Sequence, residues 1–280
     1  ERGYDSSEDL LVPGYFEMPI KKGEPVIFSA ATDPGQPEDI EQRMEEEIDA
    51  LDRRDSFYHC LVNAAHQFNM HKDGEQYVLA GYPWFKCRAR DTFISLPGLT
   101  LSIGEEAQFE KYMDTAVKAI RQYINKEPIT VSIYEMEQPD TLLWAIWCIQ
   151  QYAKYTSRKK CMERYGELIG EILGFIRYGR HANLFMHDNG LLYSNGRDVP
   201  VTWMNSTVGG HPIIPRSGYI VEFNALWYNA IRFYAQLLSE QPNEQDRSRA
   251  QHLEQSAEVV AKSFKEVFLN EYGYLLDYVD

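Results

Sequence analysis

The sequence predicts a mainly α protein of the α/α toroid class, and two observations carry this prediction. From Pro37 onward, apolar residues recur at helical spacing in a series of long segments. The connections between these segments alternate, because short ones such as residues 126–127 are followed by long ones such as residues 180–218. Antiparallel helix pairs whose long loops gather at one end form a toroid, with its site in the bowl that the loops surround. A plain helical bundle is the alternative, but bundles rarely need loops of that length.

Residues 1–36 differ from the rest of the chain. Residues 15–20 alternate loosely between apolar and polar, residues 21–24 have the composition of a turn, and residues 25–30 have that of a strand. Residues 31–38 hold Pro34, Gly35 and Pro37, which is typical of a linker. We therefore expect residues 1–36 to contain the last strands of a β-rich N-terminal domain plus a linker. Residues 37–280 are expected to be the N-terminal and central part of the helical domain.

Apolar stripes predict the helices one by one. Ile40, Met44, Ile48 and Leu51 share one face of a first helix, and a second stripe covers residues 57–68. Residues 74–90 are aromatic without a regular period, so we expect an irregular segment there. Each stripe is expected to face the core. The later helices are predicted over residues 92–103, 106–124, 139–155, 160–178, 220–239 and 246–269.

The composition excludes several classes of partner. The net charge is −14, and an acidic surface repels both nucleic acid and anionic membranes. No apolar run reaches the roughly 20 residues that a membrane span needs. The four cysteines show no paired spacing, which favours free buried thiols in a reducing compartment, such as the cytoplasm, over a zinc site. Motifs for phosphates, dinucleotides and metals are missing, and we expect neither a metal nor a cofactor.

Residues 201–228 are the most informative stretch. A loop with Trp203, two glycines and two prolines leads into a helix that carries Glu222, Asn224 and Trp227. Aromatic faces stack on sugar rings, while carboxylates and amides bond the hydroxyl groups, so this pattern fits a sugar site. A surface loop with a buried tryptophan anchor fits the pattern equally well.

A second candidate segment is residues 80–99. Tyr82 and Trp84 lie in an aromatic loop, and Arg90 stands beside Asp91 at a predicted helix start. An arginine next to a carboxylate in an aromatic loop fits a pair that binds hydroxyl groups. The alternative for Asp91 is an N-cap, because a carboxylate accepts hydrogen bonds from the free N–H groups of a helix start.

Asp140 also stands at a predicted helix start, and Trp144 lies one turn further on the same face. An N-cap is again the alternative to a binding role. Hydrolysis of a glycosidic bond requires two carboxylates, closer together for retention than for inversion. Asp91, Asp140, Asp198 and Glu222 are the candidates, and their spacing in the sequence does not choose between them.

Taken together, several blocks resemble the glucosidase part of bacterial and archaeal-type glycogen debranching enzymes, the amylo-α-1,6-glucosidases. The blocks are in the order of the family, cover nearly the whole chain, and are specific as a combination. They are Tyr15-Phe-Glu, Ala80-Gly-Tyr-Pro-Trp-Phe, Arg90-Asp-Thr-Phe-Ile-Ser-Leu-Pro-Gly-Leu, Asp140-Thr-Leu-Leu-Trp, Thr202-Trp-Met, Pro215-Arg and Val221-Glu-Phe-Asn-Ala-Leu-Trp-Tyr-Asn-Ala.

The resemblance implies an (α/α)6 toroid, incomplete in this chain, behind a β-rich N-terminal domain. It implies inverting hydrolysis of α-1,6-linked glucose at the branch points of glycogen or another branched α-glucan. The general base of the family belongs to a later loop, which we expect beyond residue 280. For this reason we expect little hydrolysis by this chain alone. The residues assigned to the sugar are Tyr82, Trp84, Arg90, Asp91, Asp140, Trp144, Trp203, Glu222, Asn224 and Trp227.

One position departs from the family pattern. Asn205 occupies the place of the general acid after Thr202-Trp-Met, and a carboxamide does not donate a proton at a useful pKa. Either Glu222 or Asp198 substitutes as the acid, or the chain is a non-catalytic relative that binds glucan, or the asparagine is an engineered change. A helical interaction scaffold without affinity for glucan is a third possible function.

Overall fold

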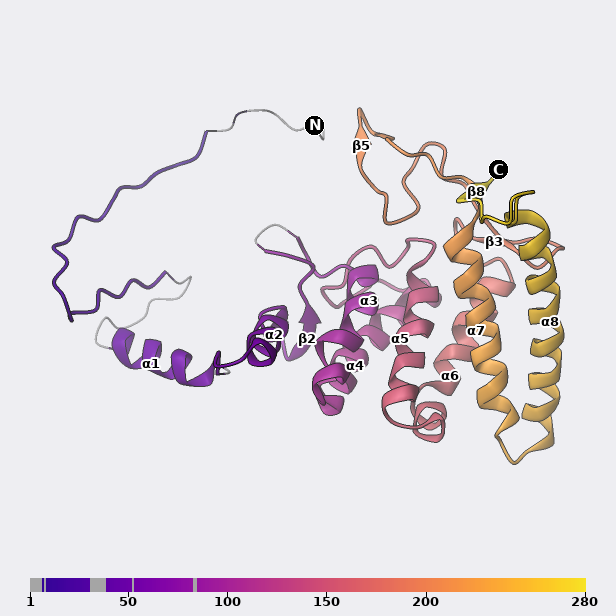
Figure 1. Ribbon diagram of the computed structural model, residues 1–280, viewed down its shortest axis with the longest axis horizontal. Helices are drawn as coiled ribbons and strands as arrows, with labels where there is room; N and C mark the ends of the chain where they lie inside the picture. The colour runs from indigo at the N-terminus through magenta and orange to yellow at the C-terminus, as the bar shows by residue number, and fades with distance from the viewer. Residues whose placement is uncertain (1–6, 8, 31–38, 52, 83–84) are drawn as a thin grey trace. The chain divides into compact units, whose positions relative to one another are not determined.

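The computed structural model describes residues 7, 9–30, 39–51, 53–82 and 85–280 (Figure 1). The chain divides into two compact units, which consist mainly of residues 3–67 and residues 68–280. Across the described residues the fold is mainly helical with a few short strands, which confirms that the protein is mainly α.

The first unit contains two helices, α1 (Ile40–Ala50) and α2 (Phe57–His66). Both were predicted, but their apolar stripes do not face a core. No residue of α1 is buried, and Ile48 is 54% exposed. An amphipathic helix buries its apolar face only where another element covers it, and no described element of this unit covers α1.

The predicted N-terminal hairpin is only partly present. The turn exists, because the backbone N–H of Glu24 donates to the carbonyl of Lys21 at 3.2 Å. Residues 25–30, however, form no strand, so that prediction was wrong. A strand requires a neighbour for its backbone groups, and no described segment pairs with these residues. Whether residues 1–36 belong to a β-rich domain stays a prediction.

The second unit is built from three helical hairpins. Each hairpin joins its two helices through a short connection. Residues 126–127 were predicted as one of the short connections, but they belong to the long segment 125–140 between α4 and α5. The pairs are α3 (Ala89–Leu99) with α4 (Glu106–Ile124), α5 (Thr141–Tyr155) with α6 (Arg158–Arg177), and α7 (Val221–Ser239) with α8 (Glu244–Phe268). A short 3₁₀ turn, η2 (Leu101–Ile103), links α3 to α4.

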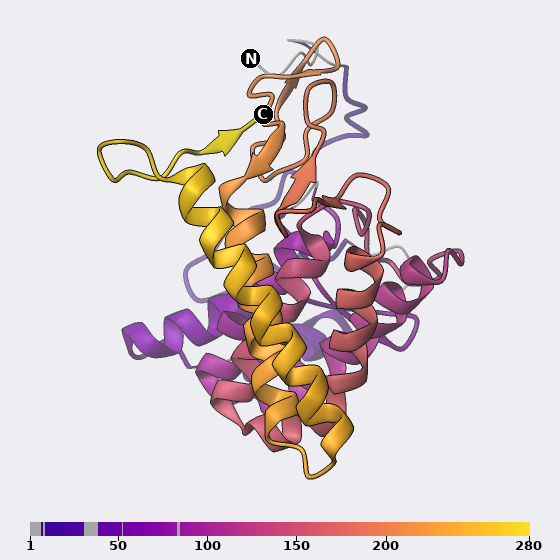
Figure 2. The same cartoon turned by 90° about the vertical axis from the view of Figure 1, so that its right-hand side faces the viewer.

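The six helices form two layers, with α3, α5 and α7 in one and α4, α6 and α8 in the other. Within the first layer the side-chain amides of Gln150 and Asn229 bond each other at 2.9 and 3.1 Å. Arg158, just after the end of α5, also pairs with Glu240, just after the end of α7, so α5 and α7 run parallel and begin at the same end. Figure 2 shows α8 beside α7, and the apolar core lies between the layers.

The start of α3 differs from its prediction by three residues. The backbone N–H of Ala89 donates to the carbonyl of Tyr134 at 2.9 Å, and Tyr134 in turn donates to Cys87 at 2.9 Å. This bridge to the loop before α5 fixes the chain direction, so the helix begins at Ala89 rather than at Thr92. Asp91 therefore lies inside the first turn and is not an N-cap.

The segment expected to be irregular begins with a hairpin instead. β1 (Asn69–Lys72) pairs with β2 (Glu75–Val78) in antiparallel register around Asp73 and Gly74. Both turn residues have positive φ, 53° and 78°, which is the requirement of a type I′ turn. The dipeptide Asp-Gly is a strong signal for such a hairpin, and the sequence prediction overlooked it.

The long connection before α7 also contains strands. A four-stranded antiparallel sheet has the order β3 (Phe185–Met186), β4 (Leu192–Ser194), β7 (Gly218–Ile220) and β8 (Tyr278–Val279). A separate hairpin of β5 (Thr207–Val208) and β6 (His211–Pro212) turns at Gly209-Gly210. The sheet ties the C-terminal residues to the start of α7.

Three of the four cysteines are buried free thiols, as predicted, while Cys60 is exposed. Burial raises the pKa of Cys87 to about 11 and that of Cys161 to about 12, so both stay protonated at neutral pH. In the described part of the chain, none of the helices combines the length and apolar character that a membrane crossing requires.

Candidate functional site

Three candidate residues lie at one end of the α3–α5–α7 layer. Arg90 is the second residue of α3, Asp140 directly precedes α5, and Glu222 is the second residue of α7. The long connections precede these three helices, and Figure 1 shows them gathered at that end of the second unit. The fold therefore groups residues that are far apart in the sequence.

Arg90 and Asp140 form a buried ion pair. The guanidinium donates from Nη2 to Oδ1 at 2.7 Å and from Nε to Oδ2 at 2.8 Å, and Asp140 is only 2% exposed. Burial raises the pKa of Asp140, while the guanidinium of Arg90 acts in the opposite direction. Such a pair is rigid, and removal of one partner would leave a buried charge without compensation.

Asp140 occupies the N-cap position of α5, yet its side chain makes no capping hydrogen bond. The capping role considered for it is therefore wrong, because Arg90 takes the carboxylate away from the helix N–H groups. The carboxylate also accepts a hydrogen bond from Nε1 of Trp144 at 3.1 Å. The ring of Trp147 packs against Trp144 at 83°, with 5.5 Å between the centroids. The Trp144 indole, which is partly exposed, is thus held in a fixed orientation, as a stacking surface requires.

A second ion cluster surrounds Arg216, just before α7. Its guanidinium donates to both oxygens of Glu222, at 2.5 and 2.6 Å, and to both oxygens of Asp277, at 2.6 and 3.0 Å. Arg216 is 2% exposed, and the two carboxylates raise its pKa although burial acts to lower it. This contact occupies both carboxylate oxygens of Glu222.

The backbone around Arg216 requires two glycines. A Cβ atom at Gly196 would lie 1.8 Å from the carbonyl oxygen of Arg216, and one at Gly218 would lie 2.2 Å from that of Val279. Gly218 also has a φ of +100°, which favours glycine. The long loop is therefore closed tightly at its base, next to the Arg216 cluster.

Trp203 and Asn205 lie beyond that base. Thr202 is buried, and its Oγ1 accepts a hydrogen bond from the backbone N–H of Met204 at 3.2 Å. The side chain of Trp203, in contrast, is 64% exposed, and that of Asn205 is also exposed. The backbone then continues into the β5–β6 hairpin, which projects from the second unit (Figure 1). Both side chains are accessible to a ligand.

Asn224 has a different surrounding from the one expected for a sugar contact. It is 0% exposed, and its amide bonds the N–H and the carbonyl of Leu192, at 2.7 and 3.0 Å, and the carbonyl of Ile220 at 3.0 Å. These three hydrogen bonds attach β4 to the start of α7. In this arrangement Asn224 supports the loop and leaves no room for a sugar hydroxyl group.

Trp227 is also buried, against the β3–β4 turn of the long loop. It is 2% exposed, and its Nε1 donates to the carbonyl of Gly190 at 3.2 Å.

The remaining candidate residues near α3 are exposed where the structure describes them. Tyr82 is 61% exposed and lies beside Phe68, with 6.3 Å between the ring centroids. Asp91 is exposed on α3. Trp84 lies outside the described residues.

The two ion clusters remain separate, because no hydrogen bond or ion pair joins Arg90 or Asp140 to the Arg216 cluster in the described ranges. Asp277 was missed by the sequence prediction. It lies 61 residues from Arg216, and no local pattern around it indicates a partner. As to metals, no three His, Cys, Asp or Glu side chains of the described residues are grouped as ligands.

The chain was compared with models of known families. A family model described as amylo-alpha-1,6-glucosidase matches residues 62–280. This range contains all six helices of the second unit and every candidate residue considered above. A comparison with curated proteins gave no match.

Proposed function

Because the chain belongs to the amylo-alpha-1,6-glucosidase family, we propose that it acts on branched α-glucans such as glycogen. The reaction we propose is inverting hydrolysis of α-1,6-linked glucose at branch points. The three hairpins α3–α4, α5–α6 and α7–α8 then belong to an (α/α)6 toroid. The observation that carries the proposal is the grouping of Arg90, Asp140 and Glu222 at one end of three parallel helices, within the range that the family matches.

The proposed sugar site is made of this helix end and the loops above it. Trp144 and Trp203 supply the stacking faces, since the first is fixed by Asp140 and the second is exposed. Tyr82 and Asp91 line the approach, and both are exposed to a ligand. The buried Arg90–Asp140 pair acts mainly as rigid support for Trp144.

Position 205 is the proposed place of the general acid. With asparagine there, the proton for the leaving oxygen must come from elsewhere, and general acid catalysis contributes about 10² to 10⁴ in rate. Glu222 is a poor substitute, because Arg216 holds both of its oxygens. Asp198 is exposed in the same loop and is the remaining candidate.

The same two observations favour a second candidate function, in which the protein binds branched glucan without cleaving it. Asn205 cannot donate the proton, and Glu222 is engaged by Arg216. The binding surfaces, Trp144 and Trp203, do not depend on either residue. The two functions differ only in turnover, so one experiment separates them.

The test measures glucose release from a phosphorylase limit dextrin by the full-length protein and by its Asn205→Asp variant. We expect the aspartate to increase release by about 10²-fold or more, with β-glucose as the first product, as inversion requires. Asn270→Asp is the matched control. The Oδ1 of Asn270 only accepts hydrogen bonds, from the N–H groups of Tyr272 and Tyr274, so its exchange should change nothing.

Equal release by both forms would show that position 205 is not the acid position. Binding of the dextrin without release by either form would favour the second candidate function. Absence of both binding and release would contradict the proposal as a whole and favour an interaction scaffold.

A further inference from the structure

Asn205 lies in a segment that meets the conditions for spontaneous deamidation. In that reaction the backbone nitrogen of the next residue attacks Cγ of the asparagine, so a small residue must follow and its N–H must be free. Ser206 follows Asn205, and its short side chain leaves the nitrogen accessible. Both residues are exposed, and residues 204–206 belong to no helix or strand. Regular structure therefore does not hold the backbone away from the side chain.

The two reacting groups make no hydrogen bond in the described part of the chain. There the Asn205 amide neither donates nor accepts, unlike the amides of Asn189 and Asn224. The N–H of Ile213 donates to the carbonyl of Ser206 at 3.0 Å, at the edge of the β5–β6 hairpin. Among the described residues, the N–H of Ser206 makes no return bond. The nitrogen and the amide are therefore both free to react.

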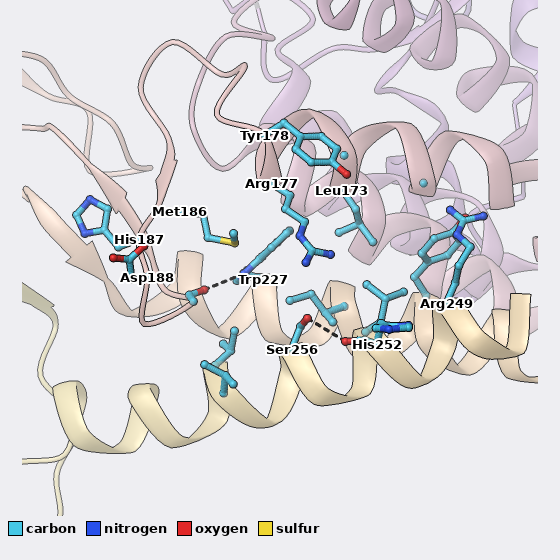
Figure 3. A pocket seen from close by; sticks show the side chains of 18 residues that line it. Leu173, Arg177, Tyr178, Met186, His187, Asp188, Trp227, Arg249, His252 and Ser256 are labelled. Carbon is cyan, nitrogen blue, oxygen red and sulfur yellow. Dashed lines mark hydrogen bonds between the residues drawn. The ribbon is translucent and has the colours of Figure 1, made fainter. Parts of the chain in front are cut away.

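Two other asparagines precede glycine, which favours deamidation even more than serine does. One is Asn189, whose Oδ1 accepts from the N–H of Leu191 at 3.0 Å. The N–H of Gly190 donates to the carbonyl of His187 at 2.9 Å. Figure 3 shows a further hydrogen bond, in which Nε1 of Trp227 donates to the carbonyl of Gly190 at 3.2 Å. The attacking nitrogen and the side chain are both engaged, so this pair is protected.

The other is Asn195, which is held by its surroundings. Its Oδ1 accepts from the N–H of Arg197 at 3.3 Å, and its own N–H donates to Oδ1 of Asn183 at 2.8 Å. Gly196 is buried, and even a Cβ atom there would lie 1.8 Å from the carbonyl oxygen of Arg216. The backbone has no room to close a ring. The structure thus reverses the order of reactivity that the sequence alone indicates.

We propose that Asn205 is a self-modification site, at which deamidation converts the asparagine to aspartate. The nitrogen of Ser206 bonds to Cγ of Asn205, Nδ2 leaves as ammonia, and a cyclic succinimide joins the two residues. Water then opens the ring. Addition at Cγ restores the peptide bond and gives aspartate, while addition at the backbone carbonyl carbon gives isoaspartate. Overall, one water is consumed and one ammonia is released.

The aspartate product places a carboxylic acid at the position where the proposed reaction needs one. This consequence rests on the proposed function, whereas the deamidation itself does not. The asparagine form is the inactive precursor, and the aspartate form is the active enzyme. Isoaspartate lengthens the backbone and displaces the carboxyl group, so only the aspartate product acts.

The test follows freshly purified full-length protein during incubation at neutral and at mildly alkaline pH. Peptide mass spectrometry measures the deamidated fraction at each asparagine, and fragmentation separates aspartate from isoaspartate. We expect Asn205 to convert before Asn189 and Asn195, and faster at the higher pH, because the attacking nitrogen must lose its proton. Glucose release from a phosphorylase limit dextrin, assayed on the same samples, should rise in proportion to the aspartate fraction at position 205.

Substitutions at the loop make the result specific. Ser206→Val should slow the conversion about tenfold, because a β-branched side chain shields the nitrogen, and a barrier about 1.4 kcal/mol higher has this effect. Ser206→Gly should accelerate it by a similar factor. Asn205→Gln is the matched control. Glutamine keeps an amide but must close a larger ring, so this variant should neither convert nor gain glucose release over the same time.

Conversion of Asn205 that is no faster than that of Asn189 would overturn the modification site and leave the proposed function standing. Conversion to aspartate without a gain in glucose release would support the modification site and contradict the place proposed for the general acid. If isoaspartate is the whole product while Asn205→Asp releases glucose, the activation is wrong and the acid position stands.

Discussion

Asp140 illustrates how little the local sequence says about a buried charge. The residue stands where an N-cap belongs, and a cap was the obvious alternative to a binding role. Its partner Arg90 lies 50 residues earlier, and no spacing rule connects the two. Only the parallel packing of α3 and α5 brings them together, and that packing is a property of the whole unit.

Removal of one member of this pair should be costly. We expect Asp140→Asn to lower the free energy of unfolding by about 3 to 5 kcal/mol, because Arg90 would stay buried without its counter-charge. The double variant Arg90→Met/Asp140→Leu should recover much of that loss. Urea denaturation followed by circular dichroism measures both effects.

Asp114→Asn is the control for this comparison. Asp114 pairs with Arg164 at 2.7 Å but is 61% exposed, so its loss should cost at most about 1 kcal/mol. Equal costs at the two positions would mean that burial does not determine the strength of the Arg90–Asp140 pair.

His181 should make stability depend on pH. It is 2% exposed, packs edge-on against Tyr123 and Phe175, and burial lowers its pKa to about 4. In the unfolded chain the pKa is about 6.5, so below that pH the unfolded state binds the extra proton. Stability is therefore lost as pH falls from about 6.5 toward 4, by about 2 kcal/mol at pH 5.

The check is denaturation of the protein and of His181→Phe at pH 7.5 and pH 5. Phenylalanine keeps the aromatic packing and cannot ionise, so the variant should lose about 2 kcal/mol less over this interval. The same pH dependence in both proteins would show that His181 does not titrate in this way.

At the scale of single elements, periodicity predicted the six helices of the second unit within a few residues. Their ends were less predictable, because the start of α3 is fixed by Tyr134 in a distant loop. The stripe of α1 predicted a helix correctly and its burial incorrectly, since a stripe identifies the apolar face but not what covers it. The β1–β2 hairpin was predictable from Asp73-Gly74 alone.

The base of the long loop offers a test at this scale. Gly196→Ala should destabilise the protein by about 2 kcal/mol or more, because its Cβ atom would overlap the carbonyl oxygen of Arg216. Gly98→Ala is the matched control. Gly98 lies in α3 with no atom near the added Cβ, so alanine should leave stability unchanged or increase it by up to about 1 kcal/mol. Similar melting temperatures for the two variants would contradict the close approach at Gly196.

At the scale of the molecule, the alternation of short and long connections predicted where the candidate residues gather. It did so because parallel helices α3, α5 and α7 each receive a long loop at the same end. It could not separate binding residues from supporting ones. Asn224 and Trp227 lie on the same helix as Glu222, yet both are buried in contacts with the β3–β4 segment.

We propose that the branched glucan binds where α3, α5 and α7 begin. The most direct measurement is amide chemical-shift mapping with a maltotetraose that carries one α-1,6-linked glucose. We predict saturable shifts around Asp91, Trp144, Trp203 and Glu222, and their loss in the Trp203→Ala variant. Binding that leaves all four regions unshifted would place the branch elsewhere and contradict this binding site.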